Sequence, residues 1–310
     1  MKIVVLDAKT LGEVDFSLLN RFGEVTVYPT TSDQQKLQRI KDANIIITNK
    51  VVIDKEAIDI AKNLQLICIA ATGMNNVDLD YAKQKGITVK NVVGYSTESV
   101  VQHTFAMAFY LIEHLPYYDT YVKSGKWSES GIFTCLDKPF FEIFNKRWGI
   151  IGMGAIGKRV AQVAQSFGCE VVYHSTSGKN LDHPYTHLDL DTLLATSDII
   201  SIHAPLNEKT KNLIQKEQLL KLKDKAILLN LGRGGIINEK ALATVIDQKE
   251  IYVGLDVTQK EPLPKDSPLL QIENRDRLLI TPHIAWTSIE ARERLFASII
   301  KNIEEFLSSN

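Results

Sequence analysis

The stretch that most constrains the fold of this chain is a glycine-rich segment near its middle. An apolar run at residues 148–151 predicts a short buried strand, and it leads directly into Gly152-Met-Gly154-Ala-Ile-Gly157. A helical pattern follows and ends at Gly168, and a second apolar strand covers residues 170–173. Strand, glycine turn, helix and strand together have the length of one βαβ unit. The segment therefore predicts a parallel sheet covered by helices.

The spacing of the three glycines also predicts a ligand. Gly152 permits a tight turn, Gly154 lets the backbone approach a pyrophosphate, and Gly157 lets the helix pack closely on the strand. The free N–H groups at the start of the helix then face the phosphates. A G-x-G-x-x-G in isolation is often only a flexible loop, but between a strand and a helix it indicates dinucleotide binding.

The end of the second strand departs from the usual dinucleotide pattern. An acidic residue that binds the adenosine ribose is expected there, and Ser175 stands in its place. Ser175 would not repel a 2′-phosphate, and Thr176, Ser177 and Lys179 could donate hydrogen bonds to one. The alternative is a polar turn without cofactor preference. The predicted cofactor is therefore NAD(H) or NADP(H), with the preference open.

Length and composition limit the remaining possibilities. A chain of 310 residues suggests two domains. The formal net charge is −1 with no block of like charge, which favours a small-molecule partner over nucleic acid or a membrane surface. Cys68, Cys135 and Cys169 lack metal-type spacing, so we expect no metal site. A sparse, odd set of cysteines fits a reducing cytoplasm.

The first part of the chain alternates between strand and helix patterns. Strands are expected at residues 3–6, 25–28, 44–48, 66–70 and 87–89, and helices at 33–41, at 54–62 and after Asp78. This alternation predicts a second parallel sheet. The turn at residues 72–74 follows a strand, at the edge where open α/β sheets bind ligands.

A long helix and an aromatic segment connect the two sheets. The helix is expected from a cap at Thr97 to about residue 115, and His103 and His114 on it are interpreted as packing or surface residues. Residues 116–146 are rich in Tyr, Phe and Trp without a clear period. They either wrap the surface of their own subunit or form an arm that packs on a second subunit, and we favour the arm because aromatic anchors are enriched at interfaces.

Further strands at residues 198–203, 226–231, 251–256 and 278–281 belong with the glycine turn, and a helix is expected at 238–248. A last helix at 289–307 is expected to return to the first sheet. The predicted domains are 1–97 plus 287–310 for the substrate and 98–286 for the dinucleotide. The second domain includes a dimerisation helix and arm at 98–146.

Unusual polar residues follow three successive strands of the second domain. Arg233 lies among glycines in Leu231-Gly-Arg-Gly-Gly235, Asp256 and Glu261 follow the next strand, and His283 stands in Thr281-Pro-His. Hydride transfer to a ketone leaves charge on its oxygen, and a histidine is the usual proton donor. A carboxylate on the other ring nitrogen fixes the tautomer, and an arginine fork binds a substrate carboxylate. Each residue alone is often a surface residue or a cap, but their convergence at one sheet edge favours catalysis.

With these motifs in place, nearly the whole chain resembles the D-isomer-specific 2-hydroxyacid dehydrogenases. The matching motifs are the glycine turn, His203-Ala-Pro-Leu206, Leu231-Gly-Arg-Gly-Gly235, Gly254-Leu-Asp-Val257, Glu261-Pro262 and Thr281-Pro-His283. The resemblance implies two doubly wound α/β domains, a Rossmann domain and a flavodoxin-like substrate domain. It also implies a homodimer joined through the long helix and the arm.

The same resemblance assigns site residues. The implied catalytic set is Arg233, Glu261 and His283, and the backbone of Thr72, Gly73 and Met74 binds the substrate carboxylate together with Arg233 and His283. His203 is expected to contribute backbone to the cofactor site rather than acid chemistry, and Asp256 to contact the nicotinamide carboxamide. The full set of implied cofactor contacts is Gly152, Gly154, Ala155, Ile156, Gly157, Ser175, His203, Ala204, Pro205, Thr210, Leu231, Gly232, Arg233, Asp256, His283 and Trp286.

Within the family, three segments are similar to glycerate dehydrogenases, also called hydroxypyruvate reductases. They are Ala71-Thr-Gly-Met-Asn-Asn-Val-Asp78, Gly94-Tyr-Ser-Thr-Glu-Ser-Val100 and Pro282-His-Ile-Ala-Trp286. The expected reaction is hydride transfer between a nicotinamide cofactor and hydroxypyruvate or D-glycerate. The alternatives are reduction of another 2-keto acid, such as glyoxylate or 3-phosphohydroxypyruvate, and a non-catalytic protein that senses dinucleotide.

Overall fold

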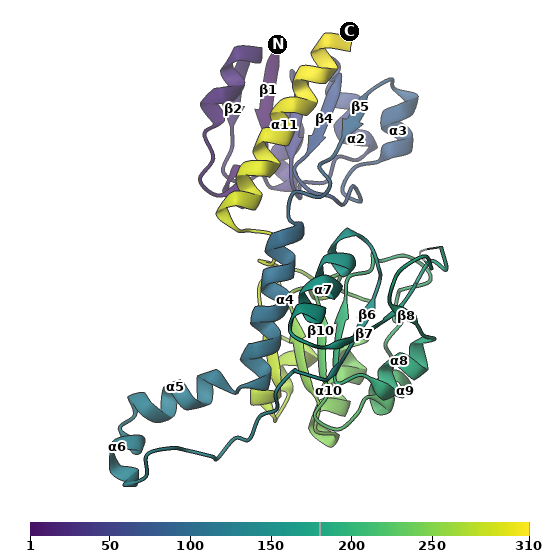
Figure 1. Ribbon diagram of the computed structural model, residues 1–310. Coiled ribbons are helices and arrows are strands. Elements are labelled where there is room, and N and C mark those ends of the chain that lie inside the picture. The colour runs from purple at the N-terminus through teal and green to yellow at the C-terminus, as the bar shows by residue number, and fades with distance from the viewer. Residues whose placement is uncertain (180, 310) are drawn as a thin grey trace. The chain divides into compact units, whose positions relative to one another are not determined.

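The computed structural model describes residues 1–179 and 181–309, which form two units, each built on one parallel sheet (Figure 1). The first unit contains Met1–Ser96 and Thr287–Asn310, and the second contains Thr97–Trp286. No helix in the described part of the chain has the length and apolar character needed to cross a membrane.

The sheet of the first unit has the strand order β2-β1-β3-β4-β5, and every pair is parallel. Its strands are β1 Lys2–Val5, β2 Glu24–Val27, β3 Ile45–Thr48, β4 Leu66–Ile69 and β5 Thr88–Lys90. This is the doubly wound order of flavodoxin-like domains, as expected. The middle strands β3 and β4 are buried along their whole length, which their continuous apolar sequences require.

Short helices connect these strands. They are α1 Asp33–Ile40, α2 Lys55–Ile60 and α3 Leu79–Gln84, with 3-10 turns η1 at Ala8–Leu11 and η2 at Phe16–Phe22. Asp54 and Asp78 precede α2 and α3, and each side chain accepts a hydrogen bond from a backbone N–H group of the first turn. Both helices therefore begin one residue after a side-chain cap.

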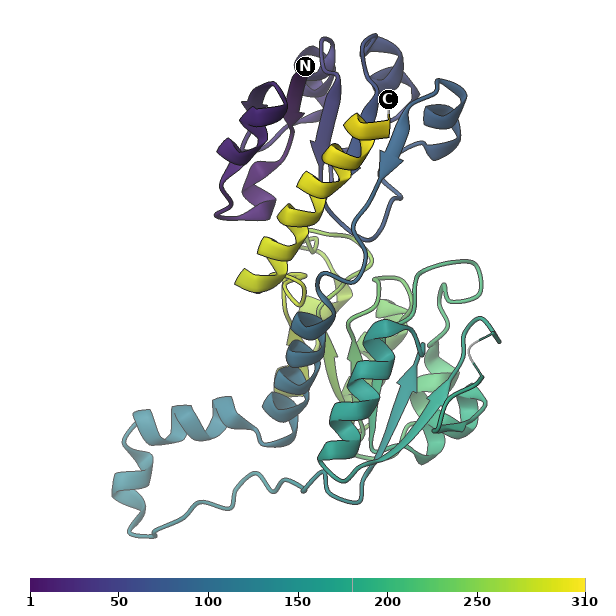
Figure 2. The same cartoon turned by 45° about the horizontal axis from the view of Figure 1, so that its top comes forward.

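The last helix, α11 at Ile289–Ser309, returns to the first unit as expected. It lies along the sheet in both views (Figures 1 and 2) and buries Leu295, Ile299 and Ile303. Glu304 pairs with Arg21 at 2.5 Å, and Glu305 pairs with Lys90 at 2.8 Å. The first domain is thus discontinuous in sequence because its final layer comes from the end of the chain.

The sheet of the second unit has seven parallel strands in the order β12-β11-β10-β9-β6-β7-β8. They are β6 Arg147–Ile151, β7 Glu170–His174, β8 Thr186–His187, β9 Ile199–Ile202, β10 Ile227–Asn230, β11 Tyr252–Leu255 and β12 Leu278–Ile280. The order reverses between β6 and β9, which makes this edge the switch point of a Rossmann sheet. The predicted fold class is therefore correct for both units.

Helices cover both faces of the second sheet. The covering helices are α4 Thr97–Ile112, α7 Ala155–Ser166, α8 Leu190–Thr196, α9 Lys216–Lys221 and α10 Glu239–Gln248. The unit also contains α5 Leu115–Lys123, α6 Lys126–Ser130 and the 3-10 turns η3 Pro268–Gln271 and η4 Arg275–Arg277. Ile150 packs in the core under α4 and α7, and Ile151 packs in the core under α8 to α10. Successive strand residues point to opposite faces, so each strand supplies both cores.

The connecting segment differs from its prediction in two respects. Helix α4 starts at Thr97 itself and ends at Ile112, because His114 has a φ of +50° and cannot continue a right-handed helix. Two helices, α5 and α6, lie in the segment that showed no clear period. Neither of them buries a residue, and both extend away from the sheet of the second unit (Figure 2).

Candidate active site

The glycine turn has the geometry that its sequence predicts. Gly152 has a φ of +97°, and a Cβ atom there would stand 2.8 Å from the backbone nitrogen of Ala204. A Cβ atom on Gly157 would stand 2.2 Å from the carbonyl oxygen of Gly152, so helix and strand pack without side chains between them. Side chains at these two positions would displace the turn.

The remaining glycine leaves space beside the backbone. No described atom lies within 4 Å of the place where a Cβ atom of Gly154 would stand, and Gly154 and Ala155 are exposed. Gly154 caps α7 without a side-chain hydrogen bond, so the first N–H groups of the helix are not capped by it. Open space and helical N–H groups fit a pyrophosphate.

Ser175 lies directly after β7, beside this turn. Gly152 donates a backbone hydrogen bond to His174 at 3.0 Å, which brings the two strand ends together. Ser175 is 8% exposed, and its carbonyl accepts a hydrogen bond from Gly178 at 3.3 Å. The position therefore presents no carboxylate, and Lys179 is exposed nearby in the chain.

The segment after β9 adjoins the same turn through its backbone. His203 donates its backbone N–H to Ile151 at 2.8 Å. Neither ring nitrogen of His203 has a hydrogen-bond partner among the described residues, and burial lowers the pKa of this imidazole to about 3. His203 therefore stays neutral near physiological pH.

Thr210 serves the loop after β9 rather than an open surface. It is fully buried, its Oγ1 donates to the carbonyl of Pro205 at 2.7 Å, and it accepts from the N–H of Asn207 at 2.8 Å. These two bonds fix the loop that carries Pro205 and Asn207.

The loop after β10 carries Arg233, and a buried asparagine holds it. The side chain of Asn230 donates to the carbonyl of Arg233 at 2.9 Å and accepts from the N–H of Gly232 at 3.1 Å. Leu231 and Gly232 are buried, while Arg233 is half-buried and donates to the carbonyl of Gly232 at 2.8 Å. No sequence motif singled out Asn230, although a polar residue at the end of an apolar strand is a recognisable signal.

Glu261 and His283 form a pair in the second unit. His283 Nδ1 lies 2.7 Å from Glu261 Oε2, and the N–H of Thr258 donates to Glu261 Oε1 at 3.1 Å. The loop of Arg233 lies against the same segment, because a Cβ atom on Gly234 would stand 1.8 Å from the carbonyl oxygen of Thr258. His283 keeps 24% of its side chain exposed, so its ring is accessible.

Asp256 is buried, and its carboxylate is hydrogen-bonded within the second unit. It is 2% exposed, and its carboxylate accepts hydrogen bonds from the backbone of Ile284 at 2.8 Å and Ala285 at 3.0 Å and from Thr281 Oγ1 at 2.7 Å. Its carbonyl also accepts from the N–H of His283 at 2.9 Å. These bonds commit Asp256 to the loop that carries His283, and Trp286 at the end of this loop packs on the core beneath.

Two residues of α4 that no motif singled out also contact this loop. Ser99 Oγ donates to the carbonyl of Ala285 at 2.6 Å, and His103 Nε2 lies 3.1 Å from Thr281 Oγ1. Burial lowers the pKa of His103, and the charge of Asp256 partly opposes this. The interpretation of His103 as a packing or surface residue is therefore incomplete. The spacing of four residues between Ser99 and His103 could have indicated two polar side chains on one face of the helix.

The first unit carries a separate run of backbone N–H groups after β4, without acceptors in the described part of the chain. The backbone N–H groups of Thr72, Gly73 and Met74 follow β4 and donate no hydrogen bond to any residue in the described ranges. The side chain of Thr72 donates to the carbonyl of Val92 at 3.0 Å, which fixes the turn. Successive free N–H groups at the carboxyl edge of a sheet form a concavity that binds an anion.

Known proteins share this arrangement of sequence and fold. The profile of "D-isomer specific 2-hydroxyacid dehydrogenase, NAD binding domain" matches residues 105–285. A hydroxypyruvate reductase of Blautia hydrogenotrophica is 37% identical over 318 residues, covering 100% of this chain and 98% of the relative. A glycerate dehydrogenase of Methylorubrum extorquens is 35% identical, covering 99% and 96%. A solved acyclic imino acid reductase in complex with NADPH and D-Arg superposes with a TM-score of 0.86 at 28% identity, covering 100% and 98%.

These similarities extend over the whole chain and both sheets, so the expected family and cofactor class are confirmed. The chain belongs to the D-isomer specific 2-hydroxyacid dehydrogenases, oxidoreductases that act on the CH–OH group of their donors with NAD(H) or NADP(H).

Proposed function

We propose that this enzyme interconverts hydroxypyruvate and D-glycerate. The observation that carries the proposal is the accessible His283 held at 2.7 Å by Glu261, beside the loop of Arg233. This arrangement supplies a proton donor and a cation for a 2-keto acid. The named activities of the two relatives, at 37% and 35% identity, favour hydroxypyruvate over other 2-keto acids.

In this proposal His283, Glu261 and Arg233 of the second unit each have one role in the reaction. The bound nicotinamide supplies the hydride for reduction or accepts it in oxidation. His283 donates a proton from Nε2 to the ketone oxygen, since Nδ1 is engaged by Glu261. Glu261 fixes the tautomer and stabilises the imidazolium, and Arg233 binds the substrate carboxylate through its guanidinium.

The domain roles follow from the same features. The second unit, with the open turn at Gly154, is the dinucleotide-binding domain. The first unit is the substrate domain, because the free N–H groups of Thr72, Gly73 and Met74 suit a carboxylate. The remaining proposed cofactor contacts are the backbone groups of residues 203–205 and 231–232, with Ser175 at the ribose.

The decisive experiment measures the purified enzyme with a panel of keto acids and both reduced cofactors. Loss of NADH or NADPH absorbance is recorded with hydroxypyruvate, glyoxylate and 3-phosphohydroxypyruvate. The highest kcat/KM is expected with hydroxypyruvate, and D-glycerate rather than L-glycerate should be the product. A higher kcat/KM with another acid would change the assigned substrate. Dinucleotide binding without any turnover would favour the sensor alternative.

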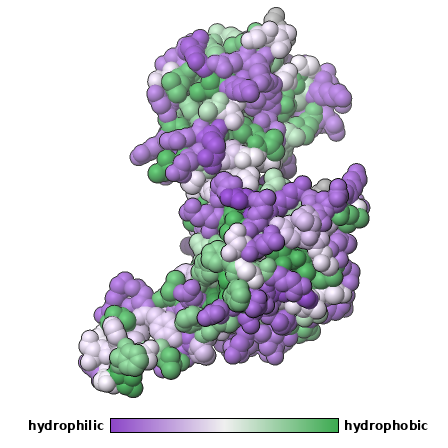
Figure 3. All heavy atoms as spheres, viewed as in Figure 1, coloured by the Kyte–Doolittle hydropathy of each residue, from purple (hydrophilic) through white to green (hydrophobic). Residues whose placement is uncertain are grey.

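We also infer that the enzyme is a cytoplasmic homodimer joined through α4 and the arm, residues 116–146. Large apolar side chains are exposed on it, and Phe133 and Leu136 keep 90% and 80% of their surface. Figure 3 shows apolar and weakly polar atoms together on the arm. The three cysteines are free, which fits a reducing compartment.

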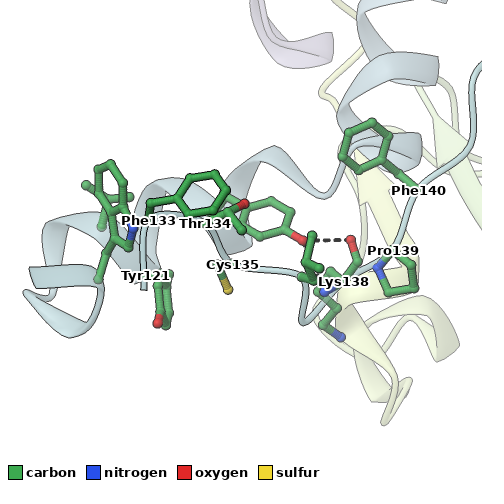
Figure 4. Close-up of a pocket in the computed structure, with 11 residues that line it drawn as sticks. Tyr121, Phe133, Thr134, Cys135, Lys138, Pro139 and Phe140 are labelled. Atoms are coloured by element: carbon green, nitrogen blue, oxygen red, sulfur yellow. Dashed lines mark hydrogen bonds between the residues drawn. The ribbon is translucent and has the colours of Figure 1, made fainter. Parts of the chain in front are cut away.

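A pocket of about 680 Å³ lies along this arm and supports the inference (Figure 4). Tyr121, Phe133 and Phe140 line it, and a hydrogen bond of 2.7 Å from Tyr118 Oη to the carbonyl of Lys138 spans it. Exposed aromatic rings around a preformed hollow are typical of interface cores. A second copy of the chain, carrying the same arm, is the proposed occupant.

A further inference from the structure

We infer that His103 is a positioning residue for the catalytic loop: acting through Thr281 and Asp256, it holds His283 in the orientation that proton transfer requires. The inference rests on the proposed function of His283. It concerns only residues of the second unit. It gives a function to the face of α4 that carries Ser99 and His103, which has no direct part in the proposed reaction.

The first observation is a directed chain of hydrogen bonds. Thr281 Oγ1 lies 2.7 Å from Asp256 Oδ1, and a carboxylate can only accept, so the single hydroxyl hydrogen of Thr281 points to Asp256. The hydroxyl oxygen is then an acceptor toward His103 Nε2 at 3.1 Å. His103 therefore carries a proton on Nε2 and donates it, which orients the threonine hydroxyl toward the carboxylate.

The second observation is that side chains of α4 form hydrogen bonds with both ends of the loop at residues 281–285. His103 reaches Thr281, where the loop begins, and Ser99 reaches the carbonyl of Ala285 at 2.6 Å, where it ends. Ser99 and His103 are four residues apart on α4 and thus lie on one face of the helix. A rigid helix of 16 residues is well suited to fix a short loop at two points.

The third observation is the backbone of His283 itself. Its φ is +55°, in the left-handed region that residues other than glycine rarely adopt. Such a conformation persists only where the surroundings hold it. Here Asp256 stabilises this conformation: its carbonyl accepts a hydrogen bond from the N–H of His283, and its carboxylate accepts from the N–H groups of Ile284 and Ala285.

These contacts link His103 to the reacting ring in three steps. His103 orients Thr281, Thr281 and the loop N–H groups orient the buried Asp256, and Asp256 holds the backbone of His283. The ring of His283 then meets Glu261 at 2.7 Å. Loss of the donor at position 103 leaves the threonine hydroxyl free to rotate away from the carboxylate, which then keeps only its bonds to the loop N–H groups. A displacement of about 1 Å at a catalytic group can lower a rate by ~10²-fold.

The test compares His103→Leu with His103→Gln in the full-length enzyme. Leucine fills the space without a donor, whereas glutamine places an amide N–H at about the reach of Nε2. For His103→Leu we expect kcat for hydroxypyruvate to fall by ~10-fold or more, with dinucleotide affinity nearly unchanged. His103→Gln should recover most of that loss. The control is Thr104→Val on the same helix, whose hydroxyl bonds only to Val100 among the described contacts.

A second pair of variants keeps the test decisive if leucine at position 103 prevents folding. Thr281→Val removes the middle of the chain at constant shape, and Thr281→Ser restores a hydroxyl. If both residues act through one chain, the double variant His103→Leu/Thr281→Val should be no slower than the slower single variant. Multiplying losses would overturn the inference. So would a His103→Leu enzyme with wild-type kcat, or equal losses in His103→Leu and His103→Gln.

The His283→Asn variant separates this result from failure of the proposed function. If His283→Asn retains full activity, the proposed acid is wrong. If His283→Asn is inactive while the residue 103 and 281 variants turn over normally, the acid stands and only the role of His103 falls.

Discussion

Glu261 holds His283 from one side only: its Oε2 lies 2.7 Å from Nδ1, while its Oε1 accepts the N–H of Thr258 at 3.1 Å. The carboxylate is thus anchored to its own loop, and the histidine takes its orientation from it. In the proposed function, Nε2 of the same ring donates the proton to the substrate. This geometry leads to the first two predictions.

Replacing His283 should remove the proton donor without removing the cofactor site. His283→Asn and His283→Ala should each lose turnover of hydroxypyruvate by ~10²–10⁴-fold, the usual contribution of general acid catalysis. Asparagine tolerates the positive φ, so its loss reports chemistry rather than backbone strain. Dinucleotide affinity, measured by calorimetry, should remain because the glycine turn is intact. Near wild-type turnover in His283→Asn would refute the assignment.

Replacing Glu261 by glutamine should slow turnover in both directions. Glutamine keeps an acceptor for Nδ1 but removes the negative charge beside the ring, so the charge-assisted hydrogen bond that orients His283 becomes weaker. In Glu261→Gln, kcat for hydroxypyruvate should fall by ~10-fold or more, while dinucleotide affinity should stay nearly unchanged. Glu250→Gln, before β11 at the amino end of the strands, is the matched control and should leave kcat unchanged. A wild-type kcat in Glu261→Gln would contradict this role of the carboxylate.

Ser175 should determine how well the enzyme accepts NADPH. Because no carboxylate stands at the end of β7, kcat/KM with NADPH is expected within a modest factor of that with NADH. Ser175→Asp should shift the ratio toward NADH by ~10-fold or more, through repulsion of the 2′-phosphate by the new charge. Ser166→Asp at the end of α7 adds the same charge elsewhere and should not shift it. A wild-type enzyme that rejects NADPH would contradict this account.

Thiol labelling should report the proposed dimer. Burial raises the pKa of Cys68 to about 12 and that of Cys169 to about 11, so neither thiol should react with iodoacetamide at neutral pH. Cys135 lines the pocket on the arm and is partly exposed in the isolated chain. Its labelling should be slow at micromolar protein and should accelerate on dilution as subunits separate. Cys135→Ser should abolish the signal.

Sedimentation of the same samples completes this test. A dimer is expected at micromolar concentration, and Phe133→Asp should shift it toward monomer, because a charge would replace an aromatic ring that is 90% exposed on the isolated arm. Rapid labelling of Cys135 at every concentration, together with a monomer in sedimentation, would exclude the arm as an interface.

The fold class and the family could be predicted from residues that are close in sequence. The glycine turn, the apolar strands before and after it, and the caps at Asp54, Asp78 and Asn238 all act within a few residues of the chain. Hydrophobic periodicity and the backbone preferences of glycine and capping residues are local properties, so they can be recognised before any tertiary contact is known. The motifs after the strands were predictable for the same reason, since parallel strands end at one edge.

The tertiary structure decided how the polar residues at that edge are used. Asp256 is committed to a loop 25 to 29 residues further along, and His103 meets Thr281 across 178 residues of sequence. Thr210 and Asn230 hold their own loops, a task that their residue types alone do not reveal. A buried polar group forms hydrogen bonds with the partners that the fold brings within reach. The distance between two residues in space cannot be read from their separation in sequence. The sequence therefore predicted which residue types stand at this edge. Their hydrogen-bond partners, including those that hold the loop of His283, depended on the folded chain.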